Sequence, residues 1–421
     1  MLKKIILYII LFFLTFLSIS LFALPIIFDL TFTIFILYFF RKNFISIFIL
    51  NCFLIILVLF INLTIGKNEK HGYFYRAHEK YTTKNKNYQK NISDEIYMPF
   101  GDIYVLDSGL NEKRELIKEP RLQRFITDSY GLRNDQNKIE NAEIILVGDS
   151  FITGNSTSQE HIPSNILSKV SKKKVSALTY GGLDPSDYES IIKKYLNIIK
   201  KDAKIFVFYF EGNDFNKIPK KESFDKKYIS WRGYKIPKIS GTIRFAYERL
   251  ERNKDKFLLK VLSDKNYFLR NIRAKSHLIY RKFFSKLHNT DSPVKYFKIK
   301  NQVVGFLHYE NPKVQFKYST YIFKNSEILN RINAIFFIPT KINIYSDYIN
   351  DFEVINNNKF EYLKNSYSKL NIPVYNLTNT MRIAAEKYLN EEKYLYWRDD
   401  THWNYNGIFE SMSYVNDIAI K

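Results

Sequence analysis

The first 66 residues of the chain are almost continuously apolar. Between residues 5 and 40 the only charged side chain is that of Asp29, and residues 43–66 contain none. Apolar stretches of about 20 residues match the hydrocarbon thickness of a membrane. The pattern therefore predicts a membrane anchor over residues 1–66, made of three transmembrane helices at residues 5–22, 25–40 and 44–63.

Basic residues lie on one side of this three-span arrangement. Lys3 and Lys4 precede the first stretch, and Arg41 and Lys42 lie between the second and the third. Because such residues favour the cytoplasmic side, the remainder of the chain is expected to be extracytoplasmic, at the inner (cytoplasmic) membrane of a bacterium. Two alternatives stay open: a cleaved signal peptide in place of the first span, or two spans with a cytoplasmic remainder.

Residues 67–141 are polar and show no sustained helical period, so they are expected to form a linker and an irregular lead-in. From residue 142 onward, short apolar runs alternate with amphipathic ones. The runs predict strands at residues 144–147, 174–179, 204–210, 334–339 and 373–377, and helices at residues 158–172, 184–200, 360–370 and 381–389. This alternation predicts an α/β fold with a parallel sheet and helices on both faces.

The alternation is interrupted after the third strand. Residues 215–331 are rich in Lys, Arg, Tyr and Phe, and we interpret them as a large insertion within a domain of residues 142–421. Helices are predicted inside the insertion at residues 243–262 and 268–287. Its basic residues are most simply a solvated face, although an anionic glycan or lipid headgroups could bind there.

Composition narrows the function only a little. The formal net charge is +22, but Lys is spread along the whole chain without a nucleic-acid-binding signature, so nucleic acid is not an expected partner. The single cysteine, Cys52, cannot form an intrachain disulfide. The chain also lacks the metal and phosphate motifs HExxH, CxxC and a Gly-rich phosphate loop, so neither a metal nor a cofactor is expected.

The first predicted strand ends in a Gly-Asp-Ser turn that presents Ser150. Gly148 permits a sharp exit from the strand, and a serine placed there becomes a nucleophile only if a base and oxyanion donors accompany it. The alternative is an ordinary turn in which Asp149 caps the next helix.

Polar turns also follow the next two strands, at Gly182 and at Asn213. The carboxyl ends of parallel strands share one edge of a sheet, where such sheets bind ligands. His402 is the candidate base, because it alone among seven histidines has carboxylates two and three residues upstream, Asp400 and Asp399. A serine's base needs such a carboxylate to fix its tautomer and stabilise the imidazolium.

Four blocks together resemble the SGNH (GDSL-type) hydrolases, in particular the membrane-anchored group similar to the alginate O-acetylation proteins. They are GDSFITG at residues 148–154, YGGLDP at 180–185, EGND at 211–214 and DTHWN at 400–404. The resemblance implies Ser150 as nucleophile, His402 as base, and an oxyanion hole formed by the Ser150 and Gly182 amides and the Asn213 side chain. Gly181 competes for the Gly182 role. Asp399 competes with Asp400 as the partner of His402, and we favour Asp400.

The resemblance and the expected location together imply an esterase or O-acyltransferase. Its substrates would be acyl esters, with acetyl expected, of an extracytoplasmic polysaccharide, with a membrane-bound acyl-transfer partner as a further expectation. Hydrolysis and transfer are not distinguished. The alternatives are a lipase or lysophospholipase, and a non-catalytic glycan-binding or assembly protein on the same scaffold.

Overall fold

The structure is a computed structural model that describes residues 81–83, 87–103, 118–134, 138–218, 228–231, 234–237, 294–307, 317–349 and 358–421. The three predicted membrane spans and the predicted helices at residues 243–262 and 268–287 lie outside these ranges. Within them, no helix combines the length and the apolar character needed to cross a membrane.

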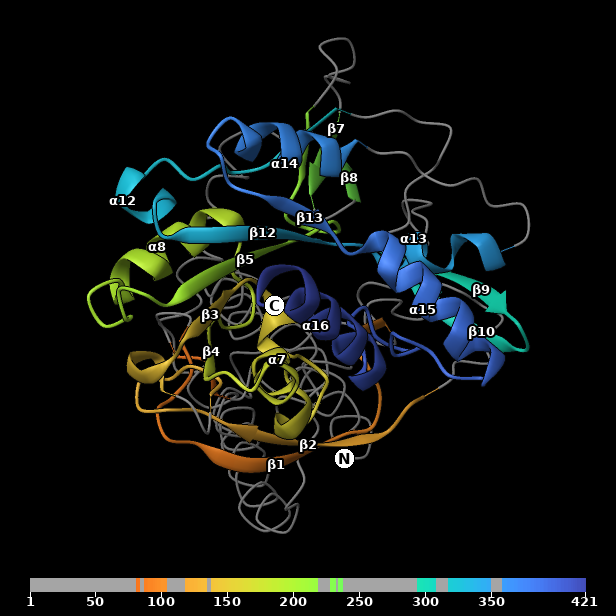
Figure 1. The fold of residues 1–421 in the computed structure, drawn as a ribbon. Coiled ribbons are helices and arrows are strands. Elements are labelled where there is room, and N and C mark those ends of the chain that lie inside the picture. The colour runs from red at the N-terminus through yellow and green to blue at the C-terminus, as the bar shows by residue number, and fades with distance from the viewer. Residues whose placement is uncertain are drawn as a thin grey trace, which may run out of the picture. The chain divides into compact units, whose positions relative to one another are not determined.

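A five-stranded parallel sheet forms the centre of the fold (Figure 1). Its strands lie in the order β13-β12-β5-β3-β4, and every neighbouring pair is parallel. Their bounds are β3 (Ile144–Val147), β4 (Val175–Leu178), β5 (Lys204–Phe210), β12 (Ile332–Ile338) and β13 (Val374–Asn376). The α/β prediction is confirmed, and all five predicted strands are present at their expected places.

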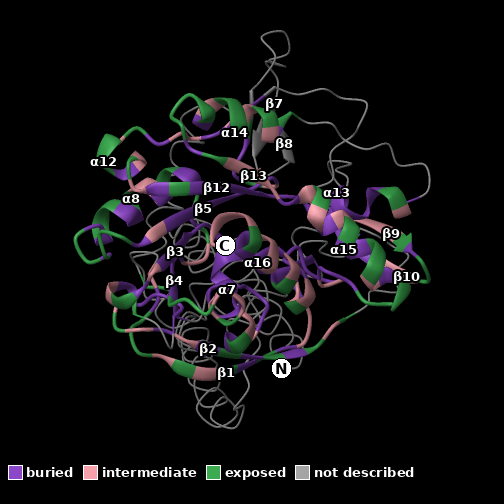
Figure 2. Cartoon of the chain, viewed as in Figure 1, coloured by how far each residue is buried: buried purple, intermediate pink, exposed green. Residues whose placement is uncertain are grey.

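Helices cover both faces of this sheet because its strands are apolar on both sides. Alternate residues of β3, such as Ile144 and Ile145, belong to two different hydrophobic clusters. One cluster contains residues of α6 (Ser150–Thr153), α7 (Pro163–Ser171), α13 (Lys341–Tyr345), α15 (Thr378–Asn390) and α16 (Tyr405–Ala419). The other contains residues of α8 (Pro185–Tyr195), α12 (Ser326–Leu329) and α14 (Lys359–Ser368). Figure 2 shows the central strands buried between these layers.

Three helices differ from their predicted form. The helix predicted at residues 158–172 is divided into a short 3-10 turn, Gln159–His161, and α7, because Pro163 lacks an N–H and fits only a first turn. Helix α8 begins after Asp184, the first residue of the predicted range, whose carboxylate caps it by accepting the Ser186 and Asp187 amides, but the helix ends at Tyr195 and not at residue 200. Helix α16 was not predicted.

The lead-in is more regular than predicted. Strands β1 (Ser93–Met98) and β2 (Arg121–Ile126) pair antiparallel, with Ser93 opposite Ile126. Inward and outward positions alternate along β2, but two of its buried residues are Arg121 and Gln123. A buried face made partly of polar side chains gives no hydrophobic alternation, which explains why the sequence pattern missed this strand.

The lead-in is bonded directly to the segment that follows Ser150. Arg133 is buried, and its guanidinium donates hydrogen bonds to the carbonyls of Thr153, Gly154 and Thr157 at 3.1, 2.6 and 2.7 Å. A buried Arg whose donors meet carbonyls holds these chain segments in fixed positions. The lead-in therefore belongs to the same compact unit as the central sheet and packs beside the segment that follows Ser150.

The described parts of the insertion form small antiparallel pairs. Strand β6 (Asn216–Ile218) pairs with β11 (Lys317–Ser319), and β9 (Lys295–Ile299) pairs with β10 (Gln302–Phe306). Strands β7 (Tyr228–Trp231) and β8 (Tyr234–Pro237) pair with each other and belong to a different compact unit from the sheet.

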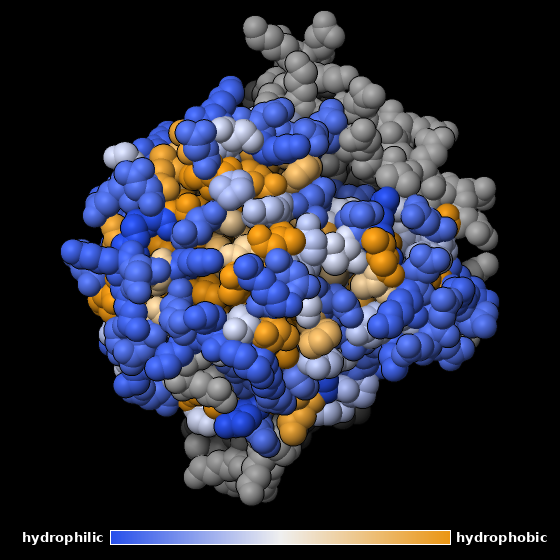
Figure 3. All heavy atoms as spheres, in the orientation of Figure 1, coloured by the Kyte–Doolittle hydropathy of each residue, from blue (hydrophilic) through white to orange (hydrophobic). Residues whose placement is uncertain are grey.

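The surface of the sheet-containing unit is mainly polar. Figure 3 shows hydrophilic residues over most of the viewed face, with apolar groups between them. The large apolar side chains that are exposed stand singly or in pairs: Tyr97 lies opposite Leu122 on β1 and β2, Tyr405 and Phe409 are in ring contact on α16, and Ile383 lies on α15. Scattered apolar residues of this kind are ordinary on a folded domain.

Candidate active site

Ser150 lies at the carboxyl end of β3, in the turn that the sequence predicted. The chain leaves the strand at Gly148. A Cβ atom on this residue would lie 2.6 Å from Cγ1 of Ile152, so a larger residue does not fit without a shift. Asp149 caps the short helix α6 by accepting the Phe151 amide at 2.9 Å. The capping role considered for Asp149 is therefore real, and it coexists with a half-buried serine side chain that contacts His402.

Ser150, His402 and Asp400 form one hydrogen-bonded chain. Nε2 of His402 lies 2.8 Å from Oγ of Ser150, and Nδ1 of His402 lies 2.6 Å from Oδ1 of Asp400. The histidine is 6 % exposed and the aspartate is fully buried. This is the geometry in which a carboxylate holds one ring nitrogen while the other accepts the serine proton.

The loop that carries His402 is fixed at both of its ends. Tyr396 and Trp403 form an antiparallel bridge, and the buried Trp403 indole donates to the Phe151 carbonyl at 3.2 Å. Asn404 then caps α16 by accepting the amides of Asn406 and Gly407. The histidine is thus held between a bridge and a helix start, and Trp403 is a core residue.

The two neighbouring aspartates have different partners. Asp400 contacts the imidazole, whereas the carboxylate of Asp399 accepts the amides of Gly101 and Glu119 at 2.8 and 2.9 Å. The structure therefore places Asp400 and not Asp399 against His402. Asp399 instead joins the catalytic loop to the lead-in.

The predicted oxyanion residues lie at the ends of β3, β4 and β5. Gly182 is exposed with a φ of 82°, and the amide of Gly181 donates to the Tyr88 hydroxyl at 2.8 Å. Because that amide already has a partner, Gly182 is the better candidate of the two. Asn213 is exposed, and its side chain is close enough to the Asp149 carboxyl group to oppose the rise that burial causes in the pKa of that group. Among the described residues, no hydrogen bond joins Gly182 to Ser150.

A set of polar residues around Asp400 was missed by the sequence analysis. Oδ2 of Asp400 accepts from Ser156 Oγ at 2.7 Å, from the Arg121 guanidinium at 3.0 Å and from the Asp102 amide at 3.1 Å. Asp102 also accepts the Thr401 amide at 2.8 Å. Ser156, Arg121 and Asp102 lie outside the four sequence blocks, so no motif pointed to them.

Lys341 also binds the backbone of the loop that carries His402. Its buried ammonium donates to the carbonyls of Gly305, Trp397, Arg398 and Asp400 at 2.7, 2.6, 3.2 and 3.1 Å. Burial lowers the pKa of Lys341 to about 8, although nearby carboxylates such as Glu119 and Asp399 oppose this change.

The charges around His402 favour an ion pair. Burial alone would raise the pKa of Asp400, but His402, Arg121 and the Ser156 hydroxyl together hold it well below its usual range. Burial alone would lower the pKa of His402, but Asp400 and Asp102 raise it above its ordinary value. The carboxylate is therefore ionised, and the imidazole readily accepts a proton.

Asp102, Asp400 and His402 also resemble a metal-ligand set, since their ligand atoms lie within 4.8 Å of one another. The existing contacts oppose this use. Nδ1 of His402 is already hydrogen-bonded to Asp400, whose other oxygen lies 3.0 Å from the Arg121 guanidinium. A guanidinium in contact with the would-be ligand compensates the same negative charge that a metal ion requires.

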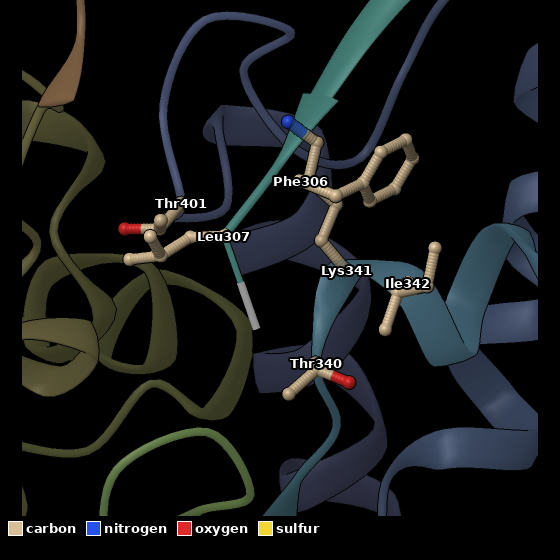
Figure 4. A pocket seen from close by; sticks show the side chains of 6 residues that line it. All are labelled: Phe306, Leu307, Thr340, Lys341, Ile342 and Thr401. Atoms are coloured by element: carbon tan, nitrogen blue, oxygen red, sulfur yellow. The ribbon is translucent and has the colours of Figure 1, made fainter. Parts of the chain in front are cut away.

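A small hollow borders this loop (Figure 4). It is lined by Phe306, Leu307, Thr340, Lys341, Ile342 and Thr401, and its volume is about 10 Å³. That volume holds about one water molecule. The hollow therefore does not indicate which acyl group or alcohol the site accepts.

Comparison of the chain with models of known protein families and with curated proteins finds no match. The function must be argued from the site itself.

Proposed function

We propose that this protein is a serine-dependent ester hydrolase or O-acyltransferase of the SGNH type. The observation that carries the proposal is the hydrogen-bonded chain from Ser150 through His402 to Asp400 at the carboxyl end of a parallel sheet. A serine, a histidine and a buried carboxylate in this order are the parts that acyl transfer requires.

In the proposed reaction, Oγ of Ser150 attacks the ester carbonyl carbon while Nε2 of His402 takes the hydroxyl proton. The resulting oxyanion is held by the Ser150 and Gly182 amides and the Asn213 side chain. Collapse of this intermediate breaks the ester bond, and His402 returns the proton to the departing alcohol. Water or an acceptor hydroxyl then attacks the acyl-serine with the same histidine as base, giving hydrolysis or transfer respectively.

The proposed substrates are acyl esters, foremost acetyl esters, of a polysaccharide outside the cytoplasm. Two features of the sequence support this part: the apolar first 66 residues with basic flanks, and the blocks that resemble the alginate-type group. If acyl groups are transferred, a membrane-bound partner would supply them from the cytoplasmic side.

Covalent labelling tests the proposal directly. A fluorophosphonate should label the full-length protein in detergent, and peptide mapping should place the label on Ser150. Ser150→Ala should abolish labelling, whereas Ser171→Ala, a change of the same kind on α7, should leave it intact. A wild-type protein that neither reacts nor cleaves any aryl acetate would refute the proposal and favour a binding protein.

A substrate panel then separates the two enzymatic alternatives. Acetylated glycans and lysophospholipids would be offered to the same preparation under identical conditions. Faster turnover of the glycan esters is expected, and preferential cleavage of the lipid esters would instead support a lipase.

A further inference from the structure

Arg121, the first residue of β2, bridges the two adjacent aspartates of the catalytic loop. Its two terminal nitrogens lie 3.0 Å from Oδ1 of Asp399 and 3.0 Å from Oδ2 of Asp400. Its guanidinium also lies 4.3 Å from the centre of the Trp397 ring. The side chain is 7 % exposed, so this contact is shielded from solvent.

The two oxygens of Asp400 have separate tasks. Oδ1 accepts from Nδ1 of His402 and from the His402 amide at 2.6 and 3.0 Å. Oδ2 faces away from the imidazole and accepts from Arg121, Ser156 and Asp102. Of these three donors only Arg121 carries a full charge, so it supplies the electrostatic part of the arrangement.

A planar guanidinium is suited to this position because its donors are fixed relative to each other. When one nitrogen binds Asp399, the other is aimed at Asp400, and Asp399 is itself fixed by the Gly101 and Glu119 amides. The orientation of Asp400 is thereby set by backbone amides of the lead-in, transmitted through one rigid group. A lysine could replace the charge but not this two-point geometry.

We propose that Arg121 is a positioning residue for acyl transfer, which orients the Asp400 carboxylate toward His402 and compensates its charge. This inference rests on the proposed function. Arg121 acts through Asp400 and touches neither substrate nor the reacting atoms.

Three variants of the full-length protein test this role. Arg121→Gln should lower kcat by about 10- to 100-fold with KM within about twofold, as is typical when a group that orients a functional side chain is lost. Arg121→Lys should recover part of the loss, because it restores the charge but not the bridge. Arg124→Gln removes the same charge from an exposed position on the same strand and should behave like wild type.

The pH dependence separates positioning from a structural role. A cation near the Asp400–His402 pair makes the imidazolium harder to form, so its removal should make protonation easier. The acid limb of kcat/KM in Arg121→Gln should therefore move to higher pH, while Arg121→Lys keeps the wild-type limb. A kcat within twofold of wild type, or a limb that does not move, would overturn the inference.

Arg121→Gln leaves two buried carboxylates without their cation, and such variants can fail to fold. The double variant Arg121→Gln/Asp399→Asn removes one negative charge together with the cation, and the same fall in kcat is expected from it. Failure of this inference is distinct from failure of the proposed function. If wild type and Arg124→Gln label at Ser150 and Arg121→Gln matches them in rate, only the role of Arg121 is refuted.

Discussion

His402 sets the pH response of the site. Its pKa is raised above 6.5, because the charges of Asp400, Asp102 and Asp149 outweigh the opposing effect of burial. A base must be neutral to accept the serine proton, so kcat/KM should fall as the pH drops through a value above 6.5. A pH profile with a neutral aryl acetate measures this, and an acid limb below 6.5 would contradict it.

The same shift predicts a trend in stability. A group whose pKa is higher in the folded than in the unfolded state stabilises the fold when it is protonated. The free energy by which His402 stabilises the fold should be fully present below pH 6.5. It should be lost as the pH rises through the pKa of His402 in the folded protein. Comparing the free energy of unfolding of wild type and His402→Gln across this range isolates the effect, which should shrink toward higher pH.

The two aspartates before His402 should separate activity from stability. Asp400→Asn should lower kcat by up to ~10⁴, since an amide favours the wrong imidazole tautomer. Asp399→Asn should lower kcat far less than Asp400→Asn, because it loosens only one of the two points that hold Arg121. It should also lower the melting temperature, because it weakens the bonds from Arg121 and two backbone amides. A large loss of kcat in Asp399→Asn alone would reverse the assignment.

Among the single residues of the site, those that belong to short contiguous motifs could be predicted from the sequence. Ser150, Asp400 and His402 stand in such motifs, and the structure brings them together. Arg121 and Asp102 could not be found in this way. Each is one polar residue in a stretch without periodicity, and its role depends on a contact with a distant part of the chain.

Among the elements, the turn after β1 packs directly against the loop that carries His402. A Cβ on Gly101 would lie under 3.0 Å from the Asp399 carbonyl and the Asp400 side chain. Gly101→Ala should therefore displace the loop, lowering kcat and costing about 1–3 kcal/mol of stability. Ser168→Ala on α7 removes the hydrogen bond from its hydroxyl to the Lys173 carbonyl but does not touch this loop, so it is a control for kcat. Unchanged kcat and melting temperature in Gly101→Ala would contradict this prediction, because they would show that the loop accommodates the added methyl group without cost.

Tyr88 plays a comparable part for the turn after β4. Its buried hydroxyl accepts the Gly181 amide at 2.8 Å, one residue before the proposed oxyanion donor. Tyr88→Phe should reduce kcat by about tenfold or less and should leave KM unchanged. The proposed oxyanion donors are all retained, but the Gly181 amide beside them loses its hydrogen bond. Steady-state kinetics test this prediction, and a change confined to KM would argue against it.

The accuracy of the element predictions follows from burial. Parallel strands buried on both faces are continuous apolar runs, so β3 and β5 were predicted at their observed residues. Strand β2 was missed because polar residues fill part of its inner face. Helix α16 was missed although its sequence held a signal: Ile408, Met412 and Val415 recur at helical spacing and are fully buried.

For the whole molecule, the proposed location can be tested without knowing the substrate. The basic residues around the first apolar stretches predict that the chain beyond residue 66 is extracytoplasmic. An alkaline phosphatase fusion after Lys67 should therefore be active in a bacterial host. A silent phosphatase together with an active cytoplasmic reporter at the same position would favour the two-span topology.

The contacts that build the site join residues far apart in the chain. Ser150 and His402 are 252 positions apart, and Asp102 and Asp400 are separated by 298. A ribosome adds about 5–20 residues per second, so roughly 10–50 s separate the synthesis of the serine from that of its base. During that interval Ser150 has no base and is as unreactive as any other alcohol. The growing polypeptide thus carries the proposed nucleophile in an unreactive form until the segment around His402 has been made and folded.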